Sequence, residues 1–172
     1  MGDTPAEYLY RTDLIKAHRL AFDLMCYAST RLAASDGTLN TASSQVLDKL
    51  GEFAPSARRV LSREIPDKSL RQELMTTKPK FKADPCRHKY EPIPVIWALN
   101  GIVHAKDMWI NHVVAKSSES ILWSVGDMII QGFGYETDER RLEHVDLFAF
   151  TEGYLSRSGK PWREFIQAKG MG

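Results

Sequence analysis

Cysteine is scarce in this chain of 172 residues, which contains only two. Two thiols cannot build the disulfide framework of a small secreted domain, so a reducing compartment is the simpler expectation. The chain also lacks an excess of charge of either sign, because 23 lysines and arginines balance 22 aspartates and glutamates to give +1. This balance argues against a strongly basic nucleic-acid-binding protein and against an acidic tail.

Long hydrophobic runs are missing as well. The longest nearly uncharged apolar stretch covers residues 93–105. As a helix it would be about 20 Å long, which is too short for the ~30 Å hydrocarbon core of a bilayer. The first eleven residues contain no apolar segment typical of a secretory signal. We therefore expect a cytoplasmic protein that does not associate with membranes.

The remaining composition is that of one globular domain. Apolar residues make up 43% of the chain and charged residues 26%, both close to the average of folded proteins. The length predicts a single domain over residues 1–172. Within it, residues 76–94 contain four prolines and several lysines, so this stretch is expected to be loop or extended chain.

Helical periodicity dominates the first third of the chain. Thr4 and Pro5 suit the cap and the first position of a helix, and apolar residues recur at spacings of three and four until about residue 34. The spacing predicts one long helix whose broad apolar face needs at least two packing partners. That face consists of Tyr10, Leu14, Ile15, Ala17, His18, Ala21, Phe22, Leu24, Met25, Cys26 and Ala28.

Shorter segments follow along the chain. We expect one helix before Pro55 and another that begins at it. A short helix after Asp67 and a buried helix over about residues 95–106 should follow. Gly126 and Asp127 suit the turn of a hairpin between strands at 121–125 and 128–135.

The remaining segments are less regular. Residues 107–120 fit neither period, residues 145–150 fit a strand or a helix, and residues 162–168 predict a short terminal helix. The predicted fold class is mainly α: a helical bundle-like single domain with a small β-hairpin or short sheet in its C-terminal half. The four tryptophans are expected to fill the core between helix and sheet, or to mark a partner surface if two are exposed together (Trp97, Trp109, Trp123 and Trp162).

The proline- and lysine-rich stretch carries the first candidate site, in which cations alternate with aromatic residues. Cations contact phosphates and aromatic rings stack on bases, as binding of single-stranded RNA or DNA requires. The alternative is a solvated loop that keeps the protein soluble, since five cations make a small electrostatic footprint. The candidate contacts are Lys78, Lys80, Phe81, Lys82, Arg87, Lys89 and Tyr90.

Asn100 and His104 form the second candidate site. They are four residues apart and therefore share one face of an otherwise apolar helix. Burying either without a partner would cost about 1–3 kcal/mol. Either they satisfy each other and the neighbouring backbone, or they border a cleft in which an imidazole can transfer protons.

The stretch Ala-Leu-Asn-Gly-Ile-Val-His-Ala at residues 98–105 resembles the signature helix of HEPN domains. These are small helical bundles, often dimeric, in which an Arg precedes a His by a few residues. Active members are metal-independent RNases that use the ribose 2′-OH, and inactive members bind RNA or serve as scaffolds. In this sequence Leu99 replaces the family's Arg, so only Asn100 and His104 match. The resemblance therefore implies RNA binding or partner binding in a dimer, with weak or absent catalysis.

Metal and thiol chemistry find little support in the sequence. Cys86, His88, His104, Asp107 and His112 have ligand chemistry, but their spacing matches no zinc motif. We expect no metal site and no cofactor.

The leading functional hypothesis is a HEPN-like helical protein that binds RNA or a partner chain as a homo-oligomer. A protein-interaction or assembly subunit without nucleic acid is one alternative, and a metal-independent RNase that uses His104 is the other. The sequence does not decide whether the protein is an enzyme.

Overall fold

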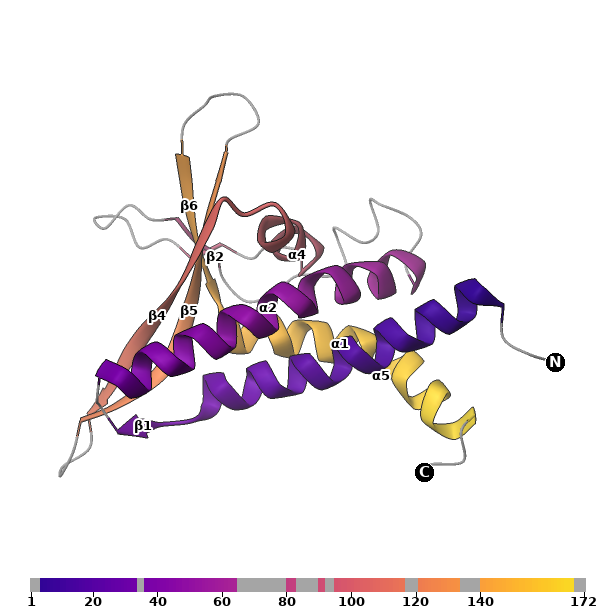
Figure 1. Ribbon diagram of the computed structural model, residues 1–172, viewed down its shortest axis with the longest axis horizontal. Coiled ribbons are helices and arrows are strands. Elements are labelled where there is room, and N and C mark those ends of the chain that lie inside the picture. The colour runs from indigo at the N-terminus through magenta and orange to yellow at the C-terminus, as the bar shows by residue number, and fades with distance from the viewer. Residues whose placement is uncertain are drawn as a thin grey trace.

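The computed structural model describes residues 4–33, 36–64, 80–82, 90–91, 95–116, 121–133 and 140–168 (Figure 1). In chain order the elements are α1 (Pro5–Ser29), β1 (Leu32–Ala33), α2 (Asp36–Glu64), β2 (Lys80–Lys82), β3 (Tyr90–Glu91), α4 (Val95–Val103), β4 (Asp107–Lys116), β5 (Ile121–Phe133), β6 (Arg140–Asp146) and α5 (Leu147–Ala168). The fold is mainly helical with an antiparallel sheet, as predicted. The predicted short helix after Asp67 lies outside the described residues.

The helices lie on one side of the sheet, with α1 next to both α2 and α5 (Figure 1). The prediction that the first helix has two packing partners is thus confirmed. Its start is also as predicted, because the hydroxyl of Thr4 accepts the N–H of Glu7 at 3.3 Å and the carboxylate of Glu7 accepts the N–H of Thr4 at 2.8 Å. This reciprocal capping satisfies two donors that the first turn would leave unpaired.

Two features of α1 differ from the prediction. The helix ends at Ser29 rather than near residue 34, because residues 32–33 pair with β5 as an edge strand. Its apolar face is narrower than expected, since Ile15 is 44% exposed and Phe22 is 56% exposed, and Cys26 is exposed as well. These three side chains lie on a different side of α1 from the buried residues, such as Leu14, Ala17 and Leu24.

The two helices predicted around Pro55 are one continuous helix, α2. Proline removes one hydrogen bond from a helix interior. Here Phe53, Ala54, Ser56 and Ala57 are all buried, so side-chain packing on both sides of the proline holds the helix together.

The C-terminal segment corrects the prediction in a similar way. Residues 140–146 form strand β6, so the stretch 145–150, which fits a strand or a helix, is divided between β6 and the start of α5. The carboxylate of Asp146 accepts the N–H of Ala149 at 2.7 Å and so caps α5. That helix then runs through Pro161 to Ala168 instead of starting near residue 162.

The described residues form a six-stranded sheet in which β5 is central and pairs with β1, β4 and β6. The predicted hairpin turn at Gly126–Asp127 is wrong, because β5 continues through both residues. The hairpin instead joins β4 to β5, so the ambiguous residues 107–116 are a strand. The helix that was predicted to reach residue 106 ends at Val103, because strand β4 begins at Asp107.

The core lies between the helices and one face of the sheet, which we call the inner face. Val125, Met128, Ile130 and Val145 are at most 2% exposed on that face. In the helical layer, Phe53 makes edge-to-face contacts with two rings of α5, those of Phe150 and Tyr154. Among the described residues, no helix is both long enough and apolar enough to cross a membrane.

Candidate nucleic-acid interface

Two parts of the predicted RNA-binding stretch are strands of the sheet. Lys80, Phe81 and Lys82 form β2, and Tyr90 begins β3. Phe81 is the register partner of Tyr90 on one side and of His144 in β6 on the other. The other candidates, Lys78, Arg87 and Lys89, lie outside the described residues.

The same register continues across the rest of the sheet. His144 pairs with Ile129 of β5, and Ile129 pairs with Trp109 of β4. Directly opposed residues on antiparallel strands lie on one face of a sheet. Positions 90, 81, 144, 129 and 109 therefore form a single row across five strands, which we call the cross-strand row. With strands ~4.8 Å apart, the row is about 19 Å long.

The cross-strand row lies on the face opposite the helices, which we call the outer face. Residues of β5 that alternate with buried Met128 and Ile130 belong to it. Trp109 is 41% exposed and Val113 is 49% exposed on this face, whereas the inner-face residues nearest the core are fully buried. The outer face thus combines exposed apolar side chains with two of the positions that the sequence singled out for base stacking.

A polar cluster lies beside the row where it crosses β5 and β6. The Nδ1 of His144 lies 3.9 Å from the Oδ2 of Asp127, and Asp127 is the register partner of Asp146. Burial raises the pKa of Asp127. The charge of His144 and a hydrogen bond with Asn111 oppose this rise, while the negative charge of Asp146 adds to it. Carboxylates in such a place can accept hydrogen bonds from the amino groups of bases.

A β-bulge positions this cluster. Gly126 and Asp127 together oppose the single residue Asn111, and the register shifts there between β4 and β5. A Cβ atom on Gly126 would lie 2.4 Å from Cγ2 of Val113, so only glycine permits this approach. The extra residue explains why Val125 and Met128 both face inward although they are three residues apart.

The structure places Asn100 and His104 one turn apart, as expected. The backbone N–H of His104 donates to the carbonyl of Asn100 at 3.1 Å, just beyond the end of α4. Their surroundings differ, because the imidazole of His104 is exposed while the Oδ1 of Asn100 is buried. That oxygen accepts no hydrogen bond from the described part of the chain. A catalytic role for this pair stays a prediction.

The candidate metal ligands are not gathered. His112 lies in β4 with its Nε2 buried, and burial lowers its pKa, whereas His104 is exposed at the end of α4. Within the described ranges, no three His, Cys, Asp or Glu side chains are close enough to hold a metal ion. Cys86 and His88 lie outside those ranges.

Trp109, Val113, Ile129 and His144 were not among the residues that sequence reasoning proposed for binding. The β-branched and aromatic residues of 109–114 were a usable signal for a strand. The pairing of Trp109 with Ile129, and of His144 with Phe81, joins segments far apart in the chain, and no local pattern encodes it. Comparison with protein-family models, with curated proteins and with solved structures found no match.

Proposed function

We propose that this protein binds single-stranded RNA in the cytoplasm through the outer face of its sheet. One observation supports the proposal above the others: the register aligns Tyr90, Phe81, His144, Ile129 and Trp109 in one row on the face that the helices leave uncovered. Aromatic and apolar residues in one row on a sheet face can provide a stacking surface for successive bases. The proposal retains the HEPN-like binding role with weak or absent catalysis.

Electrostatics set the expected strength of binding. Stacking contributes about 1–3 kcal/mol per base when a ring is removed by substitution. Lys80 and Lys82 of β2 contribute positive charge beside the row, but the net charge of +1 limits the electrostatic attraction. We therefore expect binding with a shallow dependence on salt and a strong dependence on aromatic side chains.

The test compares two exposed residues of β4 on opposite faces of the sheet. Trp109 is 41% exposed on the outer face, and Val114 is also 41% exposed but pairs with Trp123 on the other face. Fluorescence anisotropy with a labelled single-stranded oligoribonucleotide should show about tenfold weaker binding for Trp109→Ala. Val114→Ala should bind like the wild type. Equal losses in both variants, or no RNA binding by the wild type, would refute the proposal.

Cleavage is measured in the same samples. A metal-independent RNase that uses His104 would cleave RNA in EDTA and lose that activity in His104→Ala. Binding without cleavage is the outcome that the proposal predicts.

A second candidate function, assembly through a protein interface, rests on α1. Tyr8, Ile15 and Phe22 are 65%, 44% and 56% exposed, and their spacing of seven places them along one stripe of the helix. Such a stripe is typical of helices that pair with another helix. If a second copy of this chain covers it, sedimentation should show a dimer for the wild type and a monomer for Phe22→Glu. A monomeric wild type would exclude this interface.

A further inference from the structure

A hollow in the helical layer is lined by arginines that the proposed RNA interface does not use. It lies between the last turns of α2 and the end of α4, with a volume of about 630 Å³. Its lining residues are Pro55, Arg58, Arg59, Ser62, Arg63 and Val103. This size falls within the range of pockets that hold small molecules. The helices separate the hollow from the outer face of the sheet.

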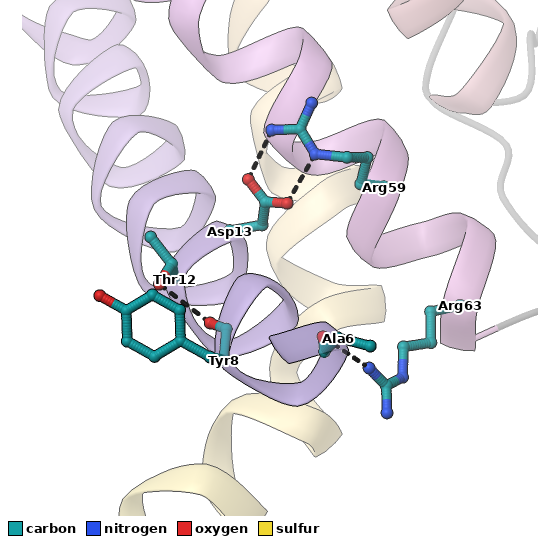
Figure 2. Close-up of polar contacts among 6 residues, drawn as sticks. All are labelled: Ala6, Tyr8, Thr12, Asp13, Arg59 and Arg63. Atoms are coloured by element: carbon teal, nitrogen blue, oxygen red, sulfur yellow. Dashed lines mark hydrogen bonds and ion pairs between the residues drawn. The ribbon is translucent and has the colours of Figure 1, made fainter. Parts of the chain in front are cut away.

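The three guanidinium groups have different partners. Arg59 donates through Nε and Nη2 to both oxygens of Asp13, each at 2.6 Å (Figure 2). Asp13 is only 9% exposed, and its buried carboxylate balances the positive charge of Arg59. Within the described residues the Nη1 of Arg59 has no acceptor, so its two N–H donors can serve a ligand.

Within the described residues, Arg63 contacts a backbone carbonyl and an aromatic ring. Its Nη1 donates to the backbone carbonyl of Ala6 at 3.3 Å (Figure 2). Its guanidinium lies 4.5 Å from the ring centre of Tyr10. The hydrogen bonds that the Glu7 carboxylate accepts from Thr4 lower the pKa of Glu7 most, and the positive charge of Arg63 helps to lower it.

Arg58 is half-buried, and within the described residues no acidic side chain pairs with it. Among the described residues, those that line the hollow include no carboxylate. Their charge is therefore positive, and Pro55 and Val103 form an apolar wall. Arg58, Arg59 and Arg63 all line this one hollow, and planar guanidinium groups match the oxygens of a phosphate group.

We infer that this hollow binds a phosphate group, with the apolar wall packing against the organic part of the same ligand. The phosphate could belong to a free mononucleotide or to the end of an RNA strand, because both present the same chemistry. Arg58 makes the main ion pair, Arg59 contributes its remaining donors, and Arg63 adds its charge.

Isothermal titration calorimetry at low salt tests this inference with adenosine monophosphate, inorganic phosphate and adenosine. We expect heat from the first two probes, none from adenosine, and weaker binding as salt increases. Arg58→Gln should weaken binding of adenosine monophosphate at least about tenfold, since a charged hydrogen-bonded contact is lost. Arg163→Gln is the matched control, because Arg163 is an exposed arginine on α5 outside the lining. Ser62→Asp should abolish binding by placing a negative charge in the hollow.

Oligoribonucleotides with and without a 5′-phosphate separate the two sources of phosphate. If the strand end is the ligand, the phosphorylated strand binds more tightly and the difference disappears in Arg58→Gln. If a free nucleotide is the ligand, adenosine monophosphate binds but the strand-end phosphate has no effect. No heat from either phosphate probe, or equal binding by wild type and a folded Arg58→Gln, overturns the inference. None of these measurements depends on Trp109, so the phosphate site and the proposed RNA interface are tested independently.

Discussion

At the scale of single residues, the cluster around Asp127 is the most informative part of the outer face. Its carboxylate is 22% exposed, lies 3.9 Å from His144 and opposes Asp146 across the strand pair. Burial and Asp146 together raise the pKa of Asp127 despite His144 and Asn111. The folded protein therefore disfavours the ionised form of this side chain more than the unfolded chain does, which lowers the free energy of unfolding at neutral pH.

Replacing Asp127 with Asn should remove this cost. At neutral pH Asp127→Asn should raise Tm slightly, by about 1–3 °C. The gain should shrink as pH falls through the raised pKa of Asp127 and vanish below the ordinary range of an aspartate, where both side chains are neutral. Thermal unfolding of both proteins across pH 3–8 measures this. A lower Tm at neutral pH would show that the ionised carboxylate stabilises the fold.

Gly126 gives a second prediction at this scale. Gly126→Ala should destabilise the protein by about 1–3 kcal/mol, because its Cβ would overlap Cγ2 of Val113 at 2.4 Å. The β-branched valine cannot swing away easily. Denaturant unfolding of Gly126→Ala, Val113→Ala and the double variant checks the cause. The account requires the double variant to recover most of the loss. An unrecovered loss would point to the backbone of the bulge instead.

Residue-scale features are also what the sequence predicts best. Thr4 was identified as the cap of α1, and the buried positions Leu14, Ala17, Ala21 and Leu24 follow from their spacing. Gly126 was recognised as special, but its role was assigned to a turn. A glycine marks a turn, a bulge or a close approach, and only the opposing strand distinguishes these cases.

At the scale of elements, tertiary packing overrides local breakers. Pro55 lies inside α2 and Pro161 inside α5, although both residues suggested helix boundaries. Strands are harder to predict, because β2 and β3 are three and two residues long and, in the described part of the chain, pair with each other and with β6. Such elements have no periodicity that a sequence could display.

Strand β2 carries the prediction that belongs to this scale. The register pairs Lys80 with Val145 and Lys82 with Glu143, so neither lysine belongs to the cross-strand row. The combined change Lys80→Glu and Lys82→Glu should nevertheless weaken RNA binding and flatten its dependence on salt, because it replaces positive with negative charge beside the row. Anisotropy titrations from low to physiological salt give the slope. Lys16→Glu with Lys49→Glu is the control pair, since both lysines lie in the helical layer. Unchanged affinity and slope in the β2 variant would exclude this strand from the interface.

At the scale of the whole molecule, the helices and the sheet form two layers with one shared core (Figure 1). The mainly helical class and the sheet in the C-terminal half could be predicted from the sequence. The size of the sheet and its two distinct faces could not, since they arise from pairings such as Trp109 with Ile129. The described helices cover one face of the sheet and not the other, and the arginine-lined hollow lies among the helices.

The tryptophans report on these surfaces separately. Trp109 lies on the outer face, the indole N–H of Trp123 is buried, Trp97 lies in α4, and Trp162 stacks on His18 with ring centres 4.3 Å apart. A single NMR experiment on protein labelled with ¹⁵N-tryptophan follows the indole N–H signal of each.

Titration of that protein with a short single-stranded oligoribonucleotide is the most direct test of the proposed interface. The account predicts a large, saturable shift of the Trp109 signal, with the Trp162 signal unmoved. An unmoved Trp109 signal beside shifts of Trp97 or Trp162, or no shift of any signal at saturating RNA, would contradict binding at the outer face.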